Sequence, residues 1–139
     1  QYKGKLGDIT VIDDYAHHPD EIRATIKTAK HYPHKKMWVV FQPHTYTRTK
    51  ALLPEFCKAL SEADAVVLAD IYAAREKNTL GISSKNLADE IEKLGTEVHY
   101  FPTFDEIENF LLANCNDNDL LITMGAGDVY KIGEKLLGK

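Results

Sequence analysis

The chain has 139 residues, a net charge of −4 at pH 7, 44% hydrophobic and 27% charged residues. These values are typical of one soluble globular domain that buries about two thirds of the surface of its unfolded chain. The acidic balance and the lack of a basic run argue against a nucleic-acid partner, and no apolar stretch approaches the roughly 20 residues that a membrane span requires.

Five apolar runs have the length of buried strands. The first is dense in β-branched residues, and the runs lack the regular polar alternation of a half-exposed strand. In chain order they span 9–14, 37–41, 65–69, 98–101 and 120–124. A polar segment at 3–8, which contains Gly4 and Gly7, predicts a turn or a short strand ahead of the first run.

Helical patterns separate these strands. Pro19 suits the first turn of a helix, where its missing N–H has no cost, and Ser83 and Thr103 are suited to cap helices. Pro54 falls inside another helical pattern and leaves the start of that helix open, so a loop through Arg48 is an alternative. The expected helices run at about 19–31, 48–62, 83–95, 103–111 and 129–137, with a surface loop at 72–82.

The order of these elements predicts the fold. Strands that alternate with helices, and that are continuous apolar runs rather than alternating ones, favour a mostly parallel sheet with helices on both faces. We therefore predict a single doubly wound α/β domain over residues 1–139. In such a sheet, ligands bind outside the carboxyl ends of the strands, so the loops that follow the strands are the first place to look for chemistry.

Charged and aromatic side chains cluster directly after the predicted strands. They are Asp13, Asp14, Tyr15, His17 and His18 after the first strand, Gln42, His44, Tyr46 and Arg48 after the second, and Asp70 and Tyr72 after the third. Their joint occurrence predicts a site for a charged ligand. One of the pair His17 and His18 is expected to be structural, and Asp70 is as well placed to cap the next helix as to bind a ligand. Arg75 and Glu76 are minor candidates.

Motifs for metals and nucleotides are incomplete. No HxH or HxxxH spacing supports a metal site made from His17, His18, His44 and Asp70, so none is predicted. The turn at 125–127 would let backbone amides approach an anion, but a GxGxxG motif would need glycine at Tyr130. Close packing of a glycine turn is the favoured explanation. No GxxxxGK[ST] sequence is present, so nothing here cradles a triphosphate by itself.

Two features of the sequence bear on the redox environment of the chain and on whether it is part of a longer polypeptide. Cys57 and Cys115 have no CxxC spacing, which predicts buried free thiols in a reducing cytoplasm. The first residue is Gln1 rather than methionine, so we expect the chain to be a piece of a longer polypeptide.

Two motifs resemble the carboxyl-terminal domain of the Mur ligase family. They are Asp13-Asp14-Tyr15-Ala16-His17-His18-Pro19 and Phe41-Gln42-Pro43-His44-Thr45-Tyr46-Thr47-Arg48-Thr49. The loop at 70–76 and the turn at 124–128 are similar as well, so the resemblance extends over essentially the whole chain. It points to the branch that adds L-alanine to UDP-N-acetylmuramate, because other branches keep an acid at the Asp14 position but lack the following His-His-Pro.

The resemblance implies an ATP-dependent, amide-forming ligase of peptidoglycan synthesis in the bacterial cytoplasm, with a role in cell shape and cell division. In this family the muramoyl carboxylate attacks the γ-phosphate of ATP, and the amine of L-alanine attacks the resulting acyl phosphate. A Rossmann-like carboxyl-terminal domain, as here, closes over an amino-terminal UDP-sugar domain and a central P-loop domain. ATP and Mg²⁺ are expected to be bound mainly by that central domain, which this chain lacks. The isolated chain is therefore expected to be inactive.

The resemblance also implies roles for individual residues. Asp14 would hydrogen-bond the ribose of ATP. The residues that would face the alanine and the acyl phosphate are Tyr15, His17, His44 and Arg48, of which the last three are the candidate catalytic residues. The planar guanidinium of Arg48 suits a carboxylate, and an imidazole near the alanine amine would orient it or assist its deprotonation. Some family members have a second arginine at the Thr45 position; in this chain the hydroxyl of Thr45 is expected to contact the ligand through water instead.

Two other classes of protein share part of the pattern. A receiver domain has the same architecture and places acids after its first and third strands, as Asp13, Asp14 and Asp70 do here. It also requires a lysine directly after the fifth strand, where this chain has Gly125. An α/β module that only binds ligands, without catalysis, is the second alternative.

Overall fold

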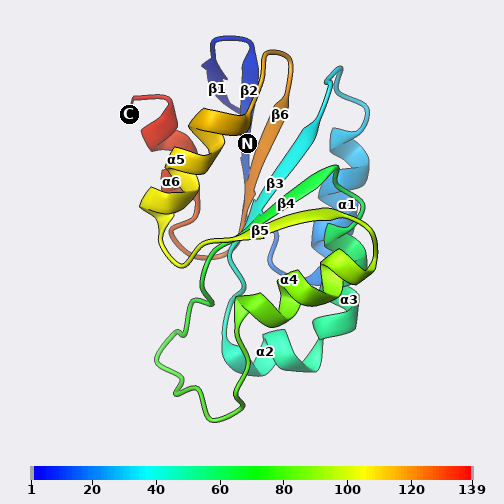
Figure 1. The fold of residues 1–139 in the computed structure, drawn as a ribbon, viewed down its shortest axis with the longest axis vertical. Helices are drawn as coiled ribbons and strands as arrows, with labels where there is room; N and C mark the ends of the chain where they lie inside the picture. Colours follow the sequence, from blue (N-terminus) through cyan, green and yellow to red (C-terminus); the bar gives the residue numbers. More distant parts are fainter. Residues whose placement is uncertain (1, 139) are drawn as a thin grey trace.

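The computed structural model describes residues 2–138, which form a six-stranded sheet between two layers of helices (Figure 1). The elements are β1 (Tyr2–Leu6), β2 (Ile9–Asp14), α1 (Pro19–Ala29), β3 (Met37–Phe41), α2 (Tyr46–Ala51), α3 (Leu53–Leu60), β4 (Ala65–Leu68), α4 (Ser84–Lys93), β5 (Glu97–Tyr100), α5 (Phe104–Asn114), β6 (Leu120–Met124) and α6 (Tyr130–Leu136). The strand order is β1-β2-β6-β3-β4-β5, and every pair is parallel except β1 with β2. The predicted doubly wound, mostly parallel sheet is confirmed.

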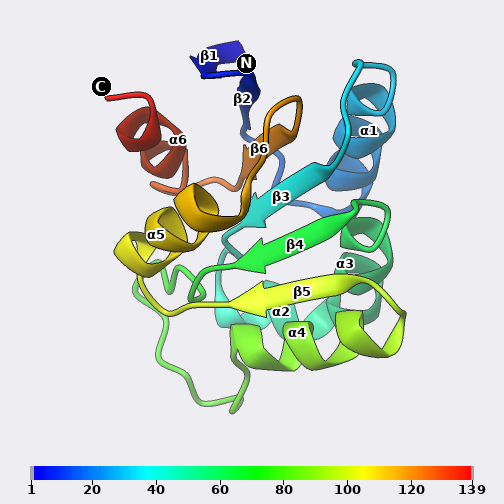
Figure 2. The ribbon, with the colours of Figure 1, turned by 45° about the horizontal axis from the view of Figure 1, so that its top comes forward.

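The two helical layers bury both faces of the sheet. Helices α1, α3 and α4 cover one face, and α5 and α6 cover the other (Figure 2). Ile22 of α1 and Phe56 of α3 share a fully buried cluster with Val39 of β3. Ile107 of α5 packs on the opposite side, in a cluster with Val40. Because successive residues of β3 are buried on opposite faces, the strand is apolar throughout, which is the pattern that its sequence shows.

The carboxyl ends of the five parallel strands lie level. Asp14 pairs with Met124, which pairs with Phe41, and the row continues through Leu68 to Tyr100. The loops after β2, β6, β3, β4 and β5 therefore leave the sheet along one edge. Because β6 lies between β2 and β3, the loop that leads to α6 emerges between the two loops that lead to α1 and α2. This is the place where α/β sheets bind ligands.

The single helix expected at 48–62 is wrong, because the structure has two helices there. The chain breaks at Leu52, whose φ of −114° and ψ of 20° are not helical. Pro54 then occupies the first turn of α3, where its missing N–H leaves no hydrogen bond unmade. Arg48 belongs to α2, so the alternative of a loop through Arg48 is wrong as well.

The turn or short strand expected at 3–8 and the buried thiol of Cys57 are confirmed, but Cys115 is only partly buried. The segment at 3–8 forms most of β1, an extra antiparallel strand at the edge of the sheet, together with its turn into β2. Cys57 is buried and Cys115 half-buried, both as free thiols, and burial raises the pKa of these thiols to about 11 and about 12.

Across residues 2–138, no helix has the length and apolar character needed to cross a membrane.

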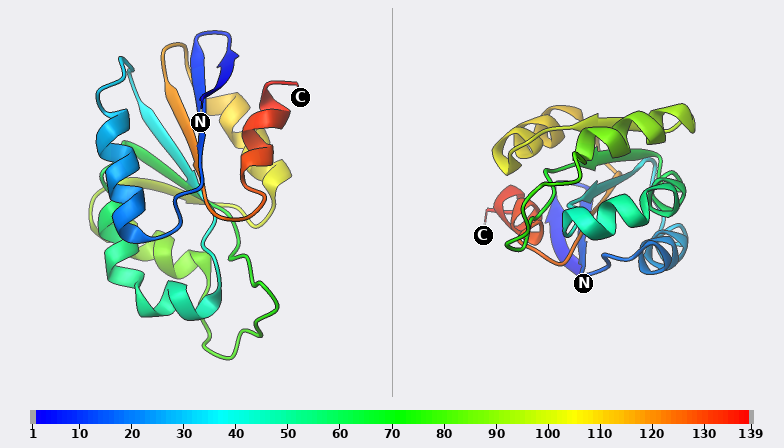
Figure 3. Two further views of the ribbon diagram at one scale, coloured as in Figure 1. Left: turned by 180° about the vertical axis from the view of Figure 1, so that it is seen from behind. Right: turned by 90° about the horizontal axis from the view of Figure 1, so that it is seen from below.

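A long loop at 69–83 joins β4 to α4 and lies beside α2 at the carboxyl edge (Figures 1 and 3). It includes the surface loop predicted at 72–82. The backbone N–H of Tyr72 donates to the carbonyl of Pro43, and the N–H of Thr45 donates to the carbonyl of Tyr72, both at 2.8 Å. These bonds make an isolated parallel bridge between His44 and Tyr72. The loop is therefore fastened to the segment that follows β3.

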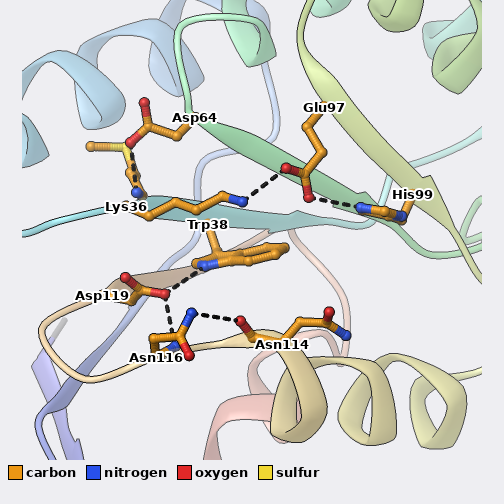
Figure 4. Close-up of polar contacts among 9 residues, drawn as sticks. Lys36, Trp38, Asp64, Glu97, His99, Asn114, Asn116 and Asp119 are labelled. Carbon is orange, nitrogen blue, oxygen red and sulfur yellow. Dashed lines mark hydrogen bonds and ion pairs between the residues drawn. The ribbon is translucent and has the colours of Figure 1, made fainter.

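Polar contacts tie together the opposite, amino edge of the sheet (Figure 4). Lys36 Nζ lies 2.8 Å from Glu97 Oε1 and 4.3 Å from the centre of the Trp38 ring, and Glu97 Oε2 lies 2.8 Å from His99 Nε2. The indole N–H of Trp38 donates to Asp119 Oδ2 at 3.0 Å. These contacts connect β3 with β5 and with the turn before β6. The predicted site residues lie at the other edge.

Candidate functional site

Two loops bring aromatic and basic side chains together at the carboxyl edge. The loop after β2 carries Tyr15 and His17, and the loop after β3 carries His44. The rings of Tyr15 and His17 meet edge to face with centroids 5.5 Å apart, and those of His17 and His44 are 6.2 Å apart. Tyr72 stacks on His44 with the ring centroids 5.4 Å apart. The two sequence motifs, 27 residues apart from His17 to His44, therefore form one cluster.

His18 has the structural role that was predicted for one of the two adjacent histidines, while the ring nitrogen Nδ1 of His17 lies 3.1 Å from the carbonyl oxygen of Tyr15. His18 is the N-cap of α1, and its Nδ1 accepts a hydrogen bond from the amide of Asp20 at 3.3 Å. The Glu21 carboxylate accepts the amides of His18 and His17 at 3.1 and 3.3 Å, and these bonds, that to His17 foremost, lower its pKa. This capping box fixes the loop, and the ring of His17 packs against Tyr15.

A hollow of about 430 Å³ lies over the carboxyl ends of β2 and β6. It is lined mainly by Asp13, Tyr15, His44, Tyr72 and the turn at 125–128. The hydroxyl of Thr123 on β6 donates to Asp13 Oδ1 at 2.6 Å. This bond joins the ends of the two neighbouring strands under the hollow.

The turn at 125–127 packs against the segment after β3 as closely as glycine permits. A Cβ atom on Gly125, whose φ is 147°, would lie 3.0 Å from the carbonyl oxygen of Gln42. A Cβ atom on Gly127 would lie 3.0 Å from the side-chain Oε1 of Gln42. The close-packing explanation of this glycine turn is confirmed, because a side chain at either position would meet Gln42.

Two basic side chains of the segment after β3 have buried atoms that no other described residue satisfies. Within residues 2–138, Arg48 Nη1 and His44 Nδ1 are buried and make no hydrogen bond. A buried donor without an acceptor costs free energy, and more so on a charged group. The arrangement therefore suits a ligand that brings its own acceptor, such as a carboxylate, to Arg48.

The pKa of His44 is lowered from its ordinary value of 6.5. Burial is the main cause, followed by the positive charge of Arg48 and then His17, while the carboxylate of Glu76 acts weakly in the opposite direction. His44 is therefore a neutral imidazole at pH 7, with one ring nitrogen able to accept a hydrogen bond or a proton.

This shift predicts how His44 affects stability. The pKa of His44 in the folded state lies below its unfolded value of 6.5, so the unfolded chain binds a proton at this residue more readily than the folded chain does. The free energy of unfolding is therefore unaffected by protonation of His44 above pH 6.5 and decreases as the pH falls below that value. Between about pH 7.5 and about pH 5.5, we expect the native chain to lose more stability than His44→Gln, by less than about 1 kcal/mol because the group is partly exposed. Urea unfolding midpoints at the two pH values test this, and equal losses would contradict it.

Thr45 adopts a strained backbone conformation at the N-cap of α2. Its φ of 65° and ψ of 147° lie in a region that residues with side chains rarely adopt. Its hydroxyl accepts the amide of Arg48 at 3.3 Å, and its carbonyl accepts the hydroxyl of Thr49 at 2.7 Å. The Thr45 side chain is thus engaged with the helix, and its contact with a ligand stays a prediction.

Asp14 lies apart from this cluster. Its two oxygens accept hydrogen bonds from the amide of Ala16 at 2.8 Å and from the hydroxyl of Thr25 at 3.1 Å. It lines a second hollow, of about 340 Å³, between α1 and the sheet. Sequence reasoning missed Thr25, although its position three residues after buried Ile22 places it on the same side of α1.

Asp70 does not cap the next helix, because Ser83 holds the N-cap position of α4. The phenol of Tyr100, at the end of β5, donates to the Asp70 carboxylate instead and has its pKa raised to about 12, chiefly by that hydrogen bond. Among residues 2–138, no group of three or more His, Cys, Asp and Glu side chains is arranged to hold a metal ion.

Comparisons with known proteins agree on one family. Residues 1–127 match the family model described as "Mur ligase, glutamate ligase domain". The chain is 65% identical over 135 residues to UDP-N-acetylmuramate–L-alanine ligase of Lachnospira eligens, covering 97% of this chain and 29% of that protein. It is 63% identical to the same enzyme of Agathobacter rectalis over 139 residues, covering 100% of this chain and 30% of that protein. The chain thus spans about 30% of the length of these relatives.

Solved structures give the same picture. The UDP-N-acetylmuramate–alanine ligase of Thermotoga maritima superposes with a TM-score of 0.74 at 32% identity, covering 94% of this chain and 26% of that chain. A domain of a putative ligase from Haemophilus ducreyi, at 24% identity, has a TM-score of 0.73, covers 99% of this chain and is itself covered to 96%. That second likeness is one of fold alone.

Proposed function

The chain belongs to the Mur ligase family, and we propose that it is the carboxyl-terminal domain of the three-domain ligase that joins L-alanine to UDP-N-acetylmuramate. The observation that carries this proposal is the cluster at the carboxyl edge, where Arg48 and His44 have buried nitrogens that no described residue satisfies. The receiver-like alternative is wrong, since the family is a different one. A domain that only binds ligands remains an outcome of the test.

In this proposal the cluster holds the amino acid. Arg48 binds the carboxylate of L-alanine, because a guanidinium presents two parallel N–H groups to two oxygens. His44, whose pKa is lowered, takes a hydrogen bond or a proton from the alanine amine. His17 and Tyr15 border the same space on the side of β2. The amine is then held ready to attack the acyl phosphate formed on UDP-N-acetylmuramate.

ATP is proposed to be bound mainly by the central domain, together with Mg²⁺, and to reach this domain at Asp14. The Asp14 oxygens each accept one hydrogen bond within the chain, so each retains acceptor capacity for a ribose hydroxyl. The hollow of about 340 Å³ beside this carboxylate gives such a group access. We place the enzyme in the bacterial cytoplasm, where ATP and UDP-sugars are available.

The test is amino-acid-dependent ATP cleavage by the complete polypeptide in which this chain occurs. With UDP-N-acetylmuramate and ATP present, we expect phosphate release to require L-alanine and not to be supported by L-glutamate. The 139-residue chain alone is the matched control, and we expect no release from it under any condition. Phosphate release that is independent of L-alanine, or absent from the complete polypeptide, would overturn the proposal and leave a binding-only domain.

A further inference from the structure

We propose that Glu76 is a positioning residue for the cluster: its carboxylate locks the loop at 69–83 onto the first turn of α2 and so fixes the segment from His44 to Arg48. The effect of this lock on L-alanine binding rests on the proposed function. The contact between Glu76 and α2 does not depend on the proposed function.

The carboxylate of Glu76 makes three hydrogen bonds to α2. Oε1 accepts the backbone amides of Tyr46 at 2.7 Å and Thr47 at 3.1 Å, and Oε2 accepts the hydroxyl of Thr47 at 2.7 Å. The first amides of a helix have no acceptor within the helix, and a negative charge at this end is favourable. Glu76 therefore acts as a helix cap supplied from 30 residues away in the sequence.

These bonds keep Glu76 ionised. The hydroxyl of Thr47 is the largest cause of its lowered pKa, followed by the amide of Thr47. Burial acts in the opposite direction, and the amide of Tyr46 lowers the pKa by a smaller amount. The amide of Arg48 is satisfied separately by Thr45. The first turn of α2 thus depends on two side chains, of which only Glu76 comes from another segment.

The loop reaches this position through an unfavourable backbone. Ala74 and Arg75 both have positive φ values, of 50° and 74°, and the amide of Glu76 closes the turn by donating to the carbonyl of Ala73 at 2.9 Å. Thr45, on the other side of the contact, is strained as well. Such conformations persist where surrounding contacts over-determine them, and the Glu76 carboxylate supplies those contacts between the two segments.

The lock matters because α2 cannot hold its own shape. It has only six residues, and helices this short are not stable without external contacts. Arg48 is carried by α2, and His44 lies next to the strained Thr45. Without the Glu76 contacts, we expect the first turn of α2 to fray and Arg48 to lose its fixed direction, while the bridge between His44 and Tyr72 still holds the loop at one point.

The structural part of the proposal is tested by amide hydrogen exchange in the chain. Glu76→Ala is expected to speed exchange at Tyr46 and Thr47 about tenfold or more, because both amides lose their acceptor. Glu76→Gln keeps an oxygen that can accept the amides, so it should fall between Glu76→Ala and the native chain. Glu62→Gln is the matched control: Glu62 Oε2 accepts a hydrogen bond from Lys30 at 2.8 Å near the amino edge, and its removal should leave both amides unchanged.

The functional part is tested by steady-state kinetics of the complete polypeptide. We expect Glu76→Ala to raise KM for L-alanine about tenfold, with KM for ATP and for UDP-N-acetylmuramate within about twofold of native. Glu76→Gln should restore most of the loss, which a merely destabilised domain would not show. Equal shifts in all three KM values, or unchanged exchange at Tyr46 and Thr47, would overturn the positioning role. If the native polypeptide shows no L-alanine dependence, the proposed function fails, and the exchange experiment still decides the role of Glu76.

Discussion

Replacing Arg48 with alanine is expected to lower kcat/KM for L-alanine about 100-fold in the complete polypeptide. A hydrogen bond to a charged group contributes roughly 1.5–3 kcal/mol, and about 2.7 kcal/mol corresponds to a factor of 100. Arg48 has a buried Nη1 that no described residue satisfies, so little of its contribution goes to the fold. Most of the loss should therefore fall on ligand binding, and steady-state kinetics with varied L-alanine measure it.

Two variants make the Arg48 prediction specific. Arg48→Lys keeps the charge but has no planar pair of N–H groups, so we expect it to recover only part of the loss. Arg23→Ala removes an arginine from α1 whose contact with Asp20, at 3.9 Å, is exposed, and should leave kcat/KM unchanged. An Arg48→Ala enzyme with native KM for L-alanine would show that another group binds the carboxylate.

Asp119→Ala is expected to lower the free energy of unfolding by about 3 kcal/mol. Asp119 is only 3% exposed, and its Oδ2 accepts both the indole N–H of Trp38 at 3.0 Å and the amide of Asn116 at 2.9 Å. The substitution leaves these two donors without an acceptor, each at a cost of roughly 1–3 kcal/mol. Denaturant unfolding followed by tryptophan fluorescence measures the loss at the one tryptophan of the chain, Trp38.

Asp117 provides the matched control, because it is an exposed acid in the same turn. Asp117→Ala should change the free energy of unfolding by less than about 0.5 kcal/mol. Asp119 lies at the amino edge, so the kinetics with L-alanine should be native in Asp119→Ala at temperatures where it is folded. A native unfolding midpoint for Asp119→Ala would mean that the indole and the amide find other acceptors.

The strands and the helical layers were predictable because a strand that is buried on both faces consists almost entirely of apolar residues. Residues 37–41 are apolar throughout, and in 120–124 Thr123 is the one polar residue, a pattern typical of strands covered by helices on both sides. The convergence of the polar residues that follow β2 and β3 was predictable for a related reason. Parallel strands send their following loops to one edge, so the polar residues after β2 and β3 had to meet there.

The features that could not be predicted depend on contacts between distant segments. The strained φ of Thr45 has no signal in its own residue type, and it occurs where the segment after β3 contacts the distant loop at 69–83. Glu76 was only a minor candidate, since no local pattern reveals a cap supplied from another loop. Pro54 was ambiguous because a proline both interrupts a helix and begins one, and the position of Leu52 decided between the two.

The central position of β6 has a consequence for how the chain folds. Residues 120–124 come after every other strand in sequence, yet β6 lies between β2 and β3 and pairs with both. Until this segment joins the sheet, the loops that carry His17 and His44 have no common edge, however well the rest has collapsed. Contacts this distant in sequence form slowly, and among the strands of this sheet β6 is the last to be synthesised. We therefore expect the side chains at the carboxyl edge to come together late in the folding of this domain, so that a partly made chain does not yet bind through them.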